Sequence, residues 1–126
     1  MADHDAIEQA LSRYHALKDA AADTHAITVR LMDEVRDLRQ QVQRLVRQLD
    51  EAKRARRRDR AMERRLESEI TSARNELKRK EARRDAKAEE QQELLRLVER
   101  CQEFLTSGGA SIKEIEAGIA LPNGRF

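Results

Sequence analysis

An unbroken heptad repeat runs from Ile7 to Leu105, and no glycine or proline interrupts it. With Ile7 at position a and Ala10 at position d, 20 of the 29 a and d positions are apolar. A repeat sustained over this length, with charged flanking positions, is typical of a left-handed coiled coil rather than of an amphipathic helix on a globular core. The sequence therefore predicts an all-α protein in which a single long α-helix over residues 7–107 forms a coiled coil.

Composition agrees with a thin helical contact. The chain has 126 residues, which allows one domain, and it is 40% charged and only 2% aromatic. Such a chain cannot build a thick globular core, whereas a coiled coil needs only about two apolar positions in seven. High charge with few aromatics is also found in disordered chains, but the regular repeat argues against disorder.

Sequence signals mark both ends of the long helix. Asp5 is a candidate N-cap, with Glu8 as its reciprocal partner, so residues 1–6 are expected to cap the helix. The helix is expected to end at Ser107-Gly108-Gly109, because glycine readily takes the left-handed conformation that closes a helix.

Residues 108–126 are expected to form a Gly-Gly hinge and a short amphipathic tail. Ser111 and Glu114 predict a capping box and a helix over about 111–117, and Pro122-Asn123-Gly124 predicts a turn. The tail is either a hook that enters a groove on a partner or a cap that folds back over the end of the coiled coil. The apolar face of this candidate hook comprises Ile112, Ile115 and Ile119.

Charged residues at positions a and d constrain how strands pair. In a parallel dimer, Arg56, Asp59 and Glu63 would each face their own copy, as would residues near 80–87. An antiparallel register in which paired residue numbers sum to 115 sets Arg56 against Asp59 and matches apolar residues towards both ends. This favours an antiparallel dimer or bundle, with a predicted oligomerisation seam of Val35, Leu38, Val42, Leu45, Leu49, Leu66, Ile70, Leu77, Leu94, Val98 and Leu105.

A helical hairpin that folds back near residues 55–60 would produce the same pairing. Two observations favour a continuous helix instead. Residues 52–66 contain no Gly, Pro or Asn on which to turn, and the heptad phase is the same on both sides. The apolar stripe also spreads onto positions e and g over 27–49 and over 94–105, where it includes Leu97 and Phe104. This predicts either a locally thicker seam in a homo-oligomer, or additional strands or a partner helix at those places.

The centre of the chain is basic. Residues 53–87 carry 15 Lys or Arg and 7 Asp or Glu, although the whole chain has a net charge of only +2. A basic stripe of this kind could neutralise phosphates of a nucleic acid, or it could be a solvated helix face. The candidate phosphate contacts are Arg54, Arg57, Arg58, Arg64 and Arg65.

No residue pattern indicates catalysis, a metal site or a cofactor site. His4, His15 and His25 are not spaced at i and i+4, and the single cysteine, Cys101, falls at position d as a small apolar residue. A thin helix also lacks a concave pocket, so we expect a protein that is not an enzyme.

The function that these patterns favour is a self-associating coiled-coil scaffold, adaptor or assembly factor, which binds another protein through its tail or apolar ends. The alternatives are a coiled-coil nucleic-acid-binding protein and a helical-hairpin escort protein that acts like a chaperone. One cysteine, with no signal-peptide pattern and no membrane-spanning apolar run, predicts a soluble intracellular protein, most simply a cytoplasmic one, with a nuclear or virion location also compatible.

Overall fold

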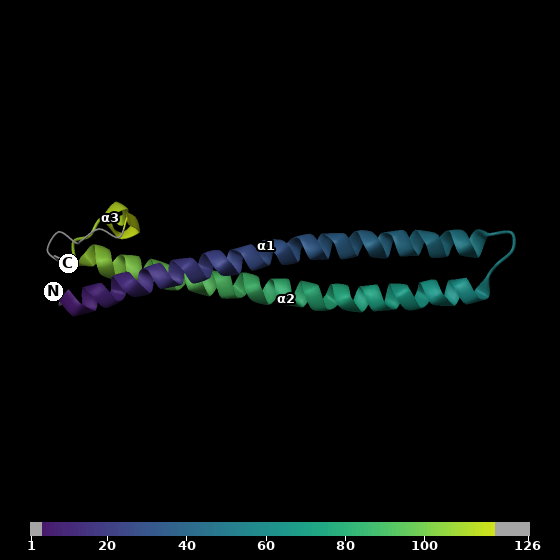
Figure 1. Ribbon diagram of the computed structural model, residues 1–126, viewed down its shortest axis with the longest axis horizontal. Helices are drawn as coiled ribbons and strands as arrows, with labels where there is room; N and C mark the ends of the chain where they lie inside the picture. The colour runs from purple at the N-terminus through teal and green to yellow at the C-terminus, as the bar shows by residue number, and fades with distance from the viewer. Residues whose placement is uncertain (1–3, 118–126) are drawn as a thin grey trace. The chain divides into compact units, whose positions relative to one another are not determined.

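The computed structural model describes residues 4–117 and contains three α-helices in that range: α1 (His4–Arg54), α2 (Arg60–Ser107) and α3 (Ile112–Ala117) (Figure 1). No strand occurs among these residues, so the predicted all-α class is confirmed. The chain divides into two units, each of which contains parts of α1 and α2. Unit 1 combines Met1–Ala26 with Ala88–Phe126, and unit 2 is Ile27–Lys87.

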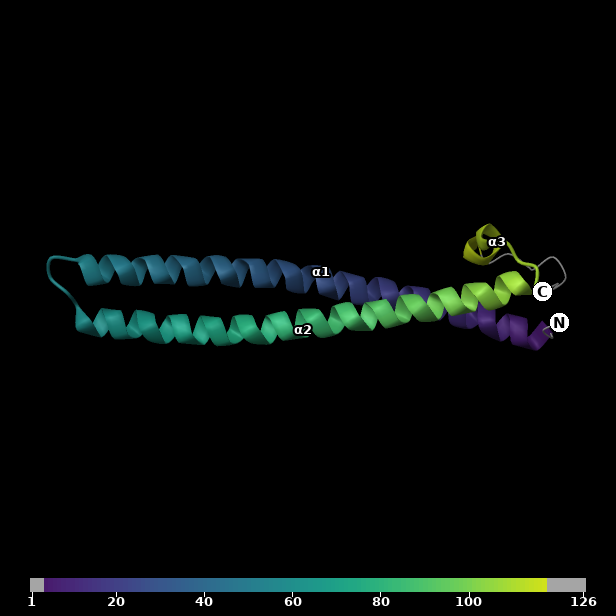
Figure 2. The ribbon, with the colours of Figure 1, turned by 180° about the vertical axis from the view of Figure 1, so that it is seen from behind.

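Unit 2 is a helical hairpin. The chain reverses over residues 55–59, and the parts of α1 and α2 in this unit lie side by side in opposite directions, as both views of the ribbon show (Figures 1 and 2). The prediction of one continuous helix through residues 52–66 is therefore wrong. In a continuous helix Arg56 and Asp59 would lie on the apolar contact, whereas the turn leaves both exposed to water.

The turn forms without glycine because it needs no left-handed residue. Among the described residues only Gly109 has a positive φ angle. The N-terminus of α2 is capped by Asp59, whose Oδ1 accepts a hydrogen bond from the backbone N–H of Met62 at 3.1 Å. Lys53 and Arg54 occupy the last turn of α1, where positive charge complements the helix dipole. The signals for two helix ends were thus present in the sequence, although Gly, Pro and Asn were absent.

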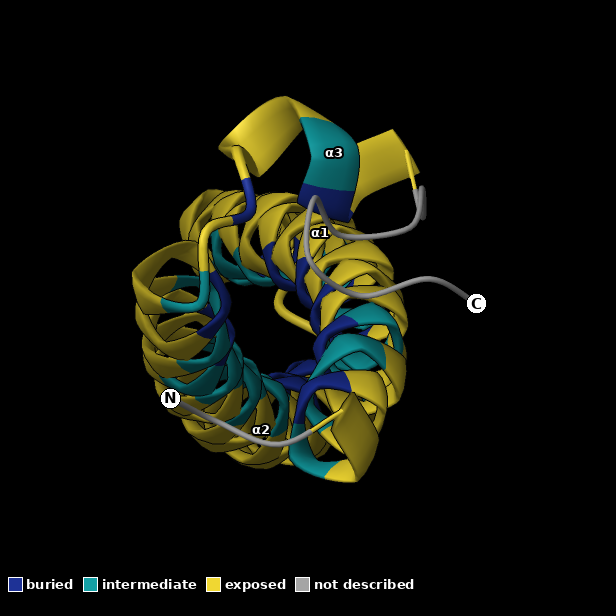
Figure 3. Ribbon diagram, turned by 90° about the vertical axis from the view of Figure 1, so that its left-hand side faces the viewer, coloured by how far each residue is buried: buried dark blue, intermediate teal, exposed yellow. Residues whose placement is uncertain are grey.

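The core of unit 2 lies between the two helices. Leu31 and Val35 are almost completely buried, and further along the hairpin a cluster comprises Leu45, Ala52, Leu66, Ile70 and Ala73. Every buried residue in the described parts of α1 and α2 falls on a predicted a or d position, and the buried segments lie on facing sides of the helices (Figure 3). The predicted heptad frame is therefore confirmed.

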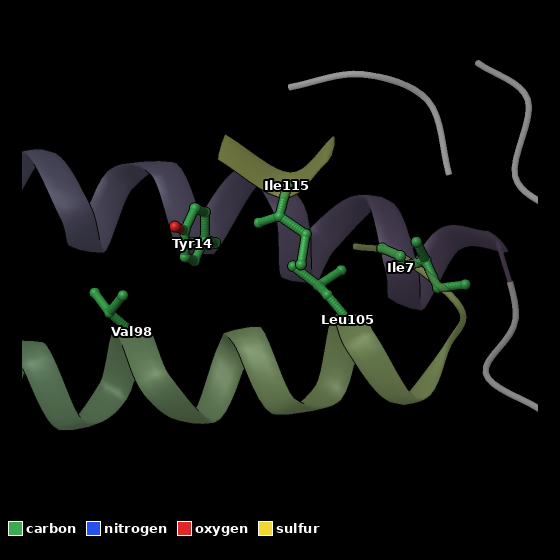
Figure 4. Close-up of a cluster of buried hydrophobic side chains, with 6 residues drawn as sticks. Ile7, Tyr14, Val98, Leu105 and Ile115 are labelled. Carbon is green, nitrogen blue, oxygen red and sulfur yellow. The ribbon is translucent and has the colours of Figure 1, made fainter. Parts of the chain in front are cut away.

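Unit 1 pairs the first part of α1 with the last part of α2 and adds α3. Its core consists of Ile7, Tyr14, Val98, Leu105, Ala110 and Ile115, whose side chains converge from the three helices and the α2–α3 connection (Figure 4). Because α3 has only six residues, it cannot be stable in isolation and depends on this packing.

The predicted end of the long helix is confirmed at α2. The helix ends at Ser107, and Gly109 has a φ of 103°, which favours glycine over any residue with a side chain. The N–H groups of Gly109 and Ala110 donate to the carbonyls of Thr106 (3.0 Å) and Leu105 (3.2 Å), which is a Schellman arrangement. Ala110 and Leu105 also meet in the core, as this motif commonly requires.

The capping box at α3 is also confirmed. The backbone N–H of Ser111 donates to Glu114 Oε2 at 3.0 Å, and the N–H of Glu114 donates to Ser111 Oγ at 3.2 Å.

At the other end of the chain the helix already includes His4, so Asp5 lies in the first turn of α1 and the prediction that it is the N-cap is wrong. Its carboxylate still complements the helix dipole at that position.

The predicted antiparallel register is found within one chain. In unit 1, Gln102 donates to the hydroxyl of Tyr14 at 3.2 Å, and Gln91 lies 3.1 Å from His25 Nδ1. In unit 2, Lys80 donates to Glu34 at 2.9 Å. The residue numbers of these pairs sum to 116, 116 and 114, close to the predicted value of 115. The residue numbers of the Arg39–Glu81 salt bridge sum to 120, so this pair is displaced by about one turn along the helix.

Candidate functional site

The predicted oligomerisation seam lies on the faces through which α1 and α2 of a single chain pack. Six of its residues are buried and five are half-buried. The buried ones are Val35, Leu45, Leu66, Ile70, Val98 and Leu105; the half-buried ones are Leu38, Val42, Leu49, Leu77 and Leu94. These side chains stabilise the fold of each unit, so surfaces outside the seam are the candidates for binding a partner.

The predicted tail hook is placed differently by the structure. Ile115 is completely buried in the core of unit 1, whereas Ile112 is 54% exposed, and Ile119 and the 122–124 turn lie outside the described residues. The interpretation of Ile115 as a residue that enters a partner's groove is therefore wrong for this conformation. The alternative of a cap that folds back on the chain describes α3 correctly, because an isoleucine gains more from a core than from water.

An apolar groove opens on one side of unit 1. It has a volume of about 490 Å³ and is lined on both helices by residues at positions c, d and g of the heptad frame. Its apolar lining consists of Ala6, Ala10 and Leu17 from α1 and of Leu97, Cys101 and Phe104 from α2. Phe104 is 40% exposed, so this face offers a large aromatic surface that the fold itself does not cover.

Helix α3 covers the opposite side of the same helix pair. Lys18, at position e of α1, forms a salt bridge with Glu116 of α3 (Nζ–Oε1 3.6 Å) and lies 5.5 Å from the centre of the Tyr14 ring. The hydrogen bond to Tyr14 and the carboxylate of Glu116 raise the pKa of Lys18 above 10.5. The salt bridge, together with the burial of Ile115 in the core of unit 1, places α3 at the e side, which leaves the g side as the open groove.

Two arginines border the groove. The polar part of its lining consists of Arg13, Arg100 and Gln9. Both arginines are exposed, and no carboxylate within residues 4–117 forms a salt bridge with either of them. The groove is therefore apolar at its floor and positively charged at its edge. The spread of apolar residues onto position g, at Leu97 and Phe104, was the sequence signal for it, whereas nothing in the sequence singled out Arg13 or Arg100.

The remaining candidate residues have structural contacts. Cys101 is a free thiol, half-buried in the floor of the groove. His4 lies 3.2 Å from Glu8, and His15 packs edge-on against Tyr14. Within the part of the chain that the structure describes, no three His, Cys, Asp or Glu side chains are grouped so as to hold a metal ion.

A second surface lies at the turn of unit 2. We call residues 53–65 the basic tip: it contains eight Lys or Arg and two carboxylates. All eight basic side chains are exposed, and they include every predicted phosphate contact: Arg54, Arg57, Arg58, Arg64 and Arg65. The hairpin therefore gathers at one turn the charges that a continuous helix would spread along its length.

Both carboxylates of the basic tip are used by the fold. Asp59 caps α2, and Glu63 is only 4% exposed. Arg58 donates from Nε to Glu63 Oε2 at 3.0 Å and from Nη2 to Oε1. These hydrogen bonds hold the pKa of Glu63 below its ordinary value of 4.5, despite the opposing effect of desolvation. Arg58 is thus neutralised locally, whereas Arg54, Arg57, Arg64 and Arg65 are not.

The rest of the basic centre is partly paired across or along the helices. Lys80 binds Glu34, and this hydrogen bond is the main reason that the pKa of Glu34 is lowered. Arg84 forms a salt bridge with Asp85 at 3.1 Å. The structure therefore separates the basic centre into a tip with free positive charge and a segment near residues 80–84 whose charges are partly balanced.

Within residues 4–117, no helix has a stretch apolar enough and long enough to cross a lipid bilayer. The chain matches no family model, no curated protein and no solved structure.

Proposed function

We propose that this protein is a non-enzymatic escort or adaptor, an antiparallel coiled coil folded from one chain, whose unit 1 binds an amphipathic helix of a partner protein. The observation that supports this proposal is the open groove bordered by Arg13 and Arg100. Apart from the Cys101 thiol, its polar lining is two guanidinium groups and one amide, so the lining holds no general base that could activate the thiol at neutral pH. The groove is suited to binding rather than to chemistry.

The occupant we infer is an α-helix with acidic flanks. The apolar lining alternates along α1 and α2 at heptad spacing, so a third helix with apolar residues at i, i+3 or i+4, and i+7 fits along it. Acidic residues beside that apolar face would pair with Arg13 and Arg100, which have no carboxylate partner among the described residues. Aromatic side chains such as Phe104 are commonly energetic anchors of such contacts.

Self-association is the second candidate, because the same groove could receive a second copy. The exposed apolar side chains Met32 and Val29 in unit 2 also favour contact with another copy. However, two grooves placed face to face would bring together the Arg13 and Arg100 of both chains, and like charges in a desolvated contact are unfavourable. We therefore propose a partner helix, rather than a second copy of the chain, as the occupant of the groove.

The test is to titrate the full chain with two synthetic peptides and to measure binding by isothermal titration calorimetry. Both peptides carry leucine at positions a and d of a helix; one has glutamate and the other lysine at the flanking positions. We expect the glutamate peptide to bind and the lysine peptide to bind at least about tenfold more weakly, the equivalent of about 1.4 kcal/mol. Phe104→Ser should weaken binding of the glutamate peptide by about tenfold or more.

Leu95→Ser is the matched control, because Leu95 has a similar exposure of 43% but does not line the groove. Equal loss of binding in the Leu95 and Phe104 variants would contradict the groove proposal. Light scattering of the unliganded chain distinguishes the second candidate. A dimer that Phe104→Ser dissociates, together with no peptide binding, would mean that the groove receives a second copy.

A further inference from the structure

We propose that the basic tip of unit 2 is a binding site for the phosphate backbone of nucleic acid, independent of the groove in unit 1. The inference starts from charge that the fold leaves unbalanced. Eight basic side chains occur within residues 53–65, and both carboxylates of this segment are used internally, Asp59 as a helix cap and Glu63 as the partner of Arg58. A polyanion therefore meets little competition from the tip's own acidic groups.

The chemistry of the tip suits phosphate. Seven of its eight basic residues are arginine, whose planar guanidinium can donate two parallel hydrogen bonds to phosphate oxygens. Arg54, Arg57, Arg64 and Arg65 are exposed, and no carboxylate among residues 4–117 forms a salt bridge with them. These four side chains can exchange water and counterions for phosphates without breaking a contact of the fold.

The arrangement of the arginines favours nucleic acid over a lipid surface. In the heptad frame Arg54 lies at position f of α1, and Arg64 and Arg65 lie at positions b and c of α2. These positions face away from the partner helix, so the side chains project from opposite sides of the hairpin. A flat membrane reaches only one side or the turn itself, and a duplex is too stiff to bend around the tip, whereas a flexible single strand can follow the tip around. The tip also has no exposed large apolar residue to insert into lipid, since Met62 is half-buried in the cluster between the helices.

Binding at this site should depend little on base sequence. Residues 53–65 contain no aromatic side chain on which a base could stack and no Asn or Gln for paired contacts with adenine, so the contact left for reading a base is that of arginine with guanine. Affinity should therefore come from release of counterions, and it should fall steeply as salt rises.

The experiment uses the full chain and fluorescent single-stranded RNA and double-stranded DNA of mixed sequence, with anisotropy measured over a series of salt concentrations. The tip variant Arg57→Gln, Arg64→Gln, Arg65→Gln removes three charges and leaves the Arg58–Glu63 pair intact. The matched control Arg74→Gln, Lys78→Gln, Arg79→Gln removes three exposed charges from the same unit. Circular dichroism checks that both variants retain their helix content.

We expect the wild-type chain to bind the single-stranded RNA. The tip variant should lose affinity for it by about two orders of magnitude at 0.1 M salt, because three phosphate contacts account for a change of about 2.1 in the slope of log K against log salt for a single strand. The control variant should retain most of the affinity and slope. Absence of binding at low salt, or an equal loss in the control, would overturn the proposal. Binding to phosphatidylserine vesicles in the absence of nucleic-acid binding would assign the tip to a membrane surface instead. Phe104→Ser should not change nucleic-acid binding, so failure here is distinguishable from failure of the groove proposal.

Discussion

Replacing Leu105 by alanine should destabilise unit 1 strongly. Leu105 is completely buried and meets Ile7, Tyr14 and Ile115 in the core of that unit. Truncation of a buried leucine to alanine costs about 3–5 kcal/mol, of which about 2.4 kcal/mol is lost transfer free energy at about 0.8 kcal/mol per carbon and the rest is the cavity. Leu105 lies two residues before the end of α2, where α3 can shift to fill part of the space, so we expect the lower value of about 3 kcal/mol.

The assay is urea unfolding of the full chain followed by circular dichroism. With a slope of about 2 kcal/mol/M, a loss of about 3 kcal/mol lowers the midpoint by about 1.5 M. The control is Leu95→Ala on the same helix, whose side chain is partly exposed and whose replacement should cost less than about 1 kcal/mol. A Leu105 variant no less stable than the Leu95 variant would refute the packing of unit 1 described above. The double variant Leu105→Ala, Ile115→Ala then measures the coupling between α2 and α3. Because residues in contact show non-additive effects, its loss of unfolding free energy should differ from the sum of the two single losses.

Two further outcomes are expected. The variant Tyr14→Cys should form a disulfide with Cys101 on mild oxidation, because Cys101 packs against the cluster that contains Tyr14. The oxidised product should keep the mass of one chain. A product of twice that mass would mean that the two helices come from different chains. Glu63→Gln should reduce the loss of unfolding free energy that the chain shows as the pH falls. Since Arg58 lowers the pKa of Glu63, the carboxylate's stabilising contribution is present above the unfolded value near 4.5 and is lost as the pH falls through the lower folded value. Urea midpoints measured from neutral pH to below pH 4.5 should converge at low pH for the wild type and Glu63→Gln, whereas the control Glu67→Gln, at an exposed site, should follow the wild type throughout. A constant difference in urea midpoint between Glu63→Gln and the wild type at every pH would contradict the role of the Arg58–Glu63 pair.

Features that depend on neighbouring residues were predictable from the sequence. The heptad frame identified every buried position of the described α1 and α2, and the Gly108-Gly109 pair and the Ser111–Glu114 box marked the end of α2 and the start of α3. Each of these signals is local, because helix periodicity and caps involve residues within a few positions of one another.

The hairpin was not predictable from the same patterns. Pairing of positions a and d is identical whether the second helix belongs to the same chain or to another, so the register near 115 is compatible with both arrangements. The absence of Gly, Pro and Asn near residue 56 was misleading, because the turn of unit 2 requires no positive φ angle. The Asp59 cap and the charges at Arg56 and Asp59 were the better guide.

The sequence by itself determined that the chain is helical, which positions of α1 and α2 are buried, where α2 ends and where α3 begins. Only the tertiary structure decided that α1 and α2 of one chain pack together in each unit, that α3 covers the e side and leaves the g-side groove open, and that the basic residues gather at one turn. The physical reason is that an apolar stripe specifies that a face must be buried but not which surface buries it. That choice depends on chain reversal and on the docking of Ile115, which bring together residues far apart in the sequence.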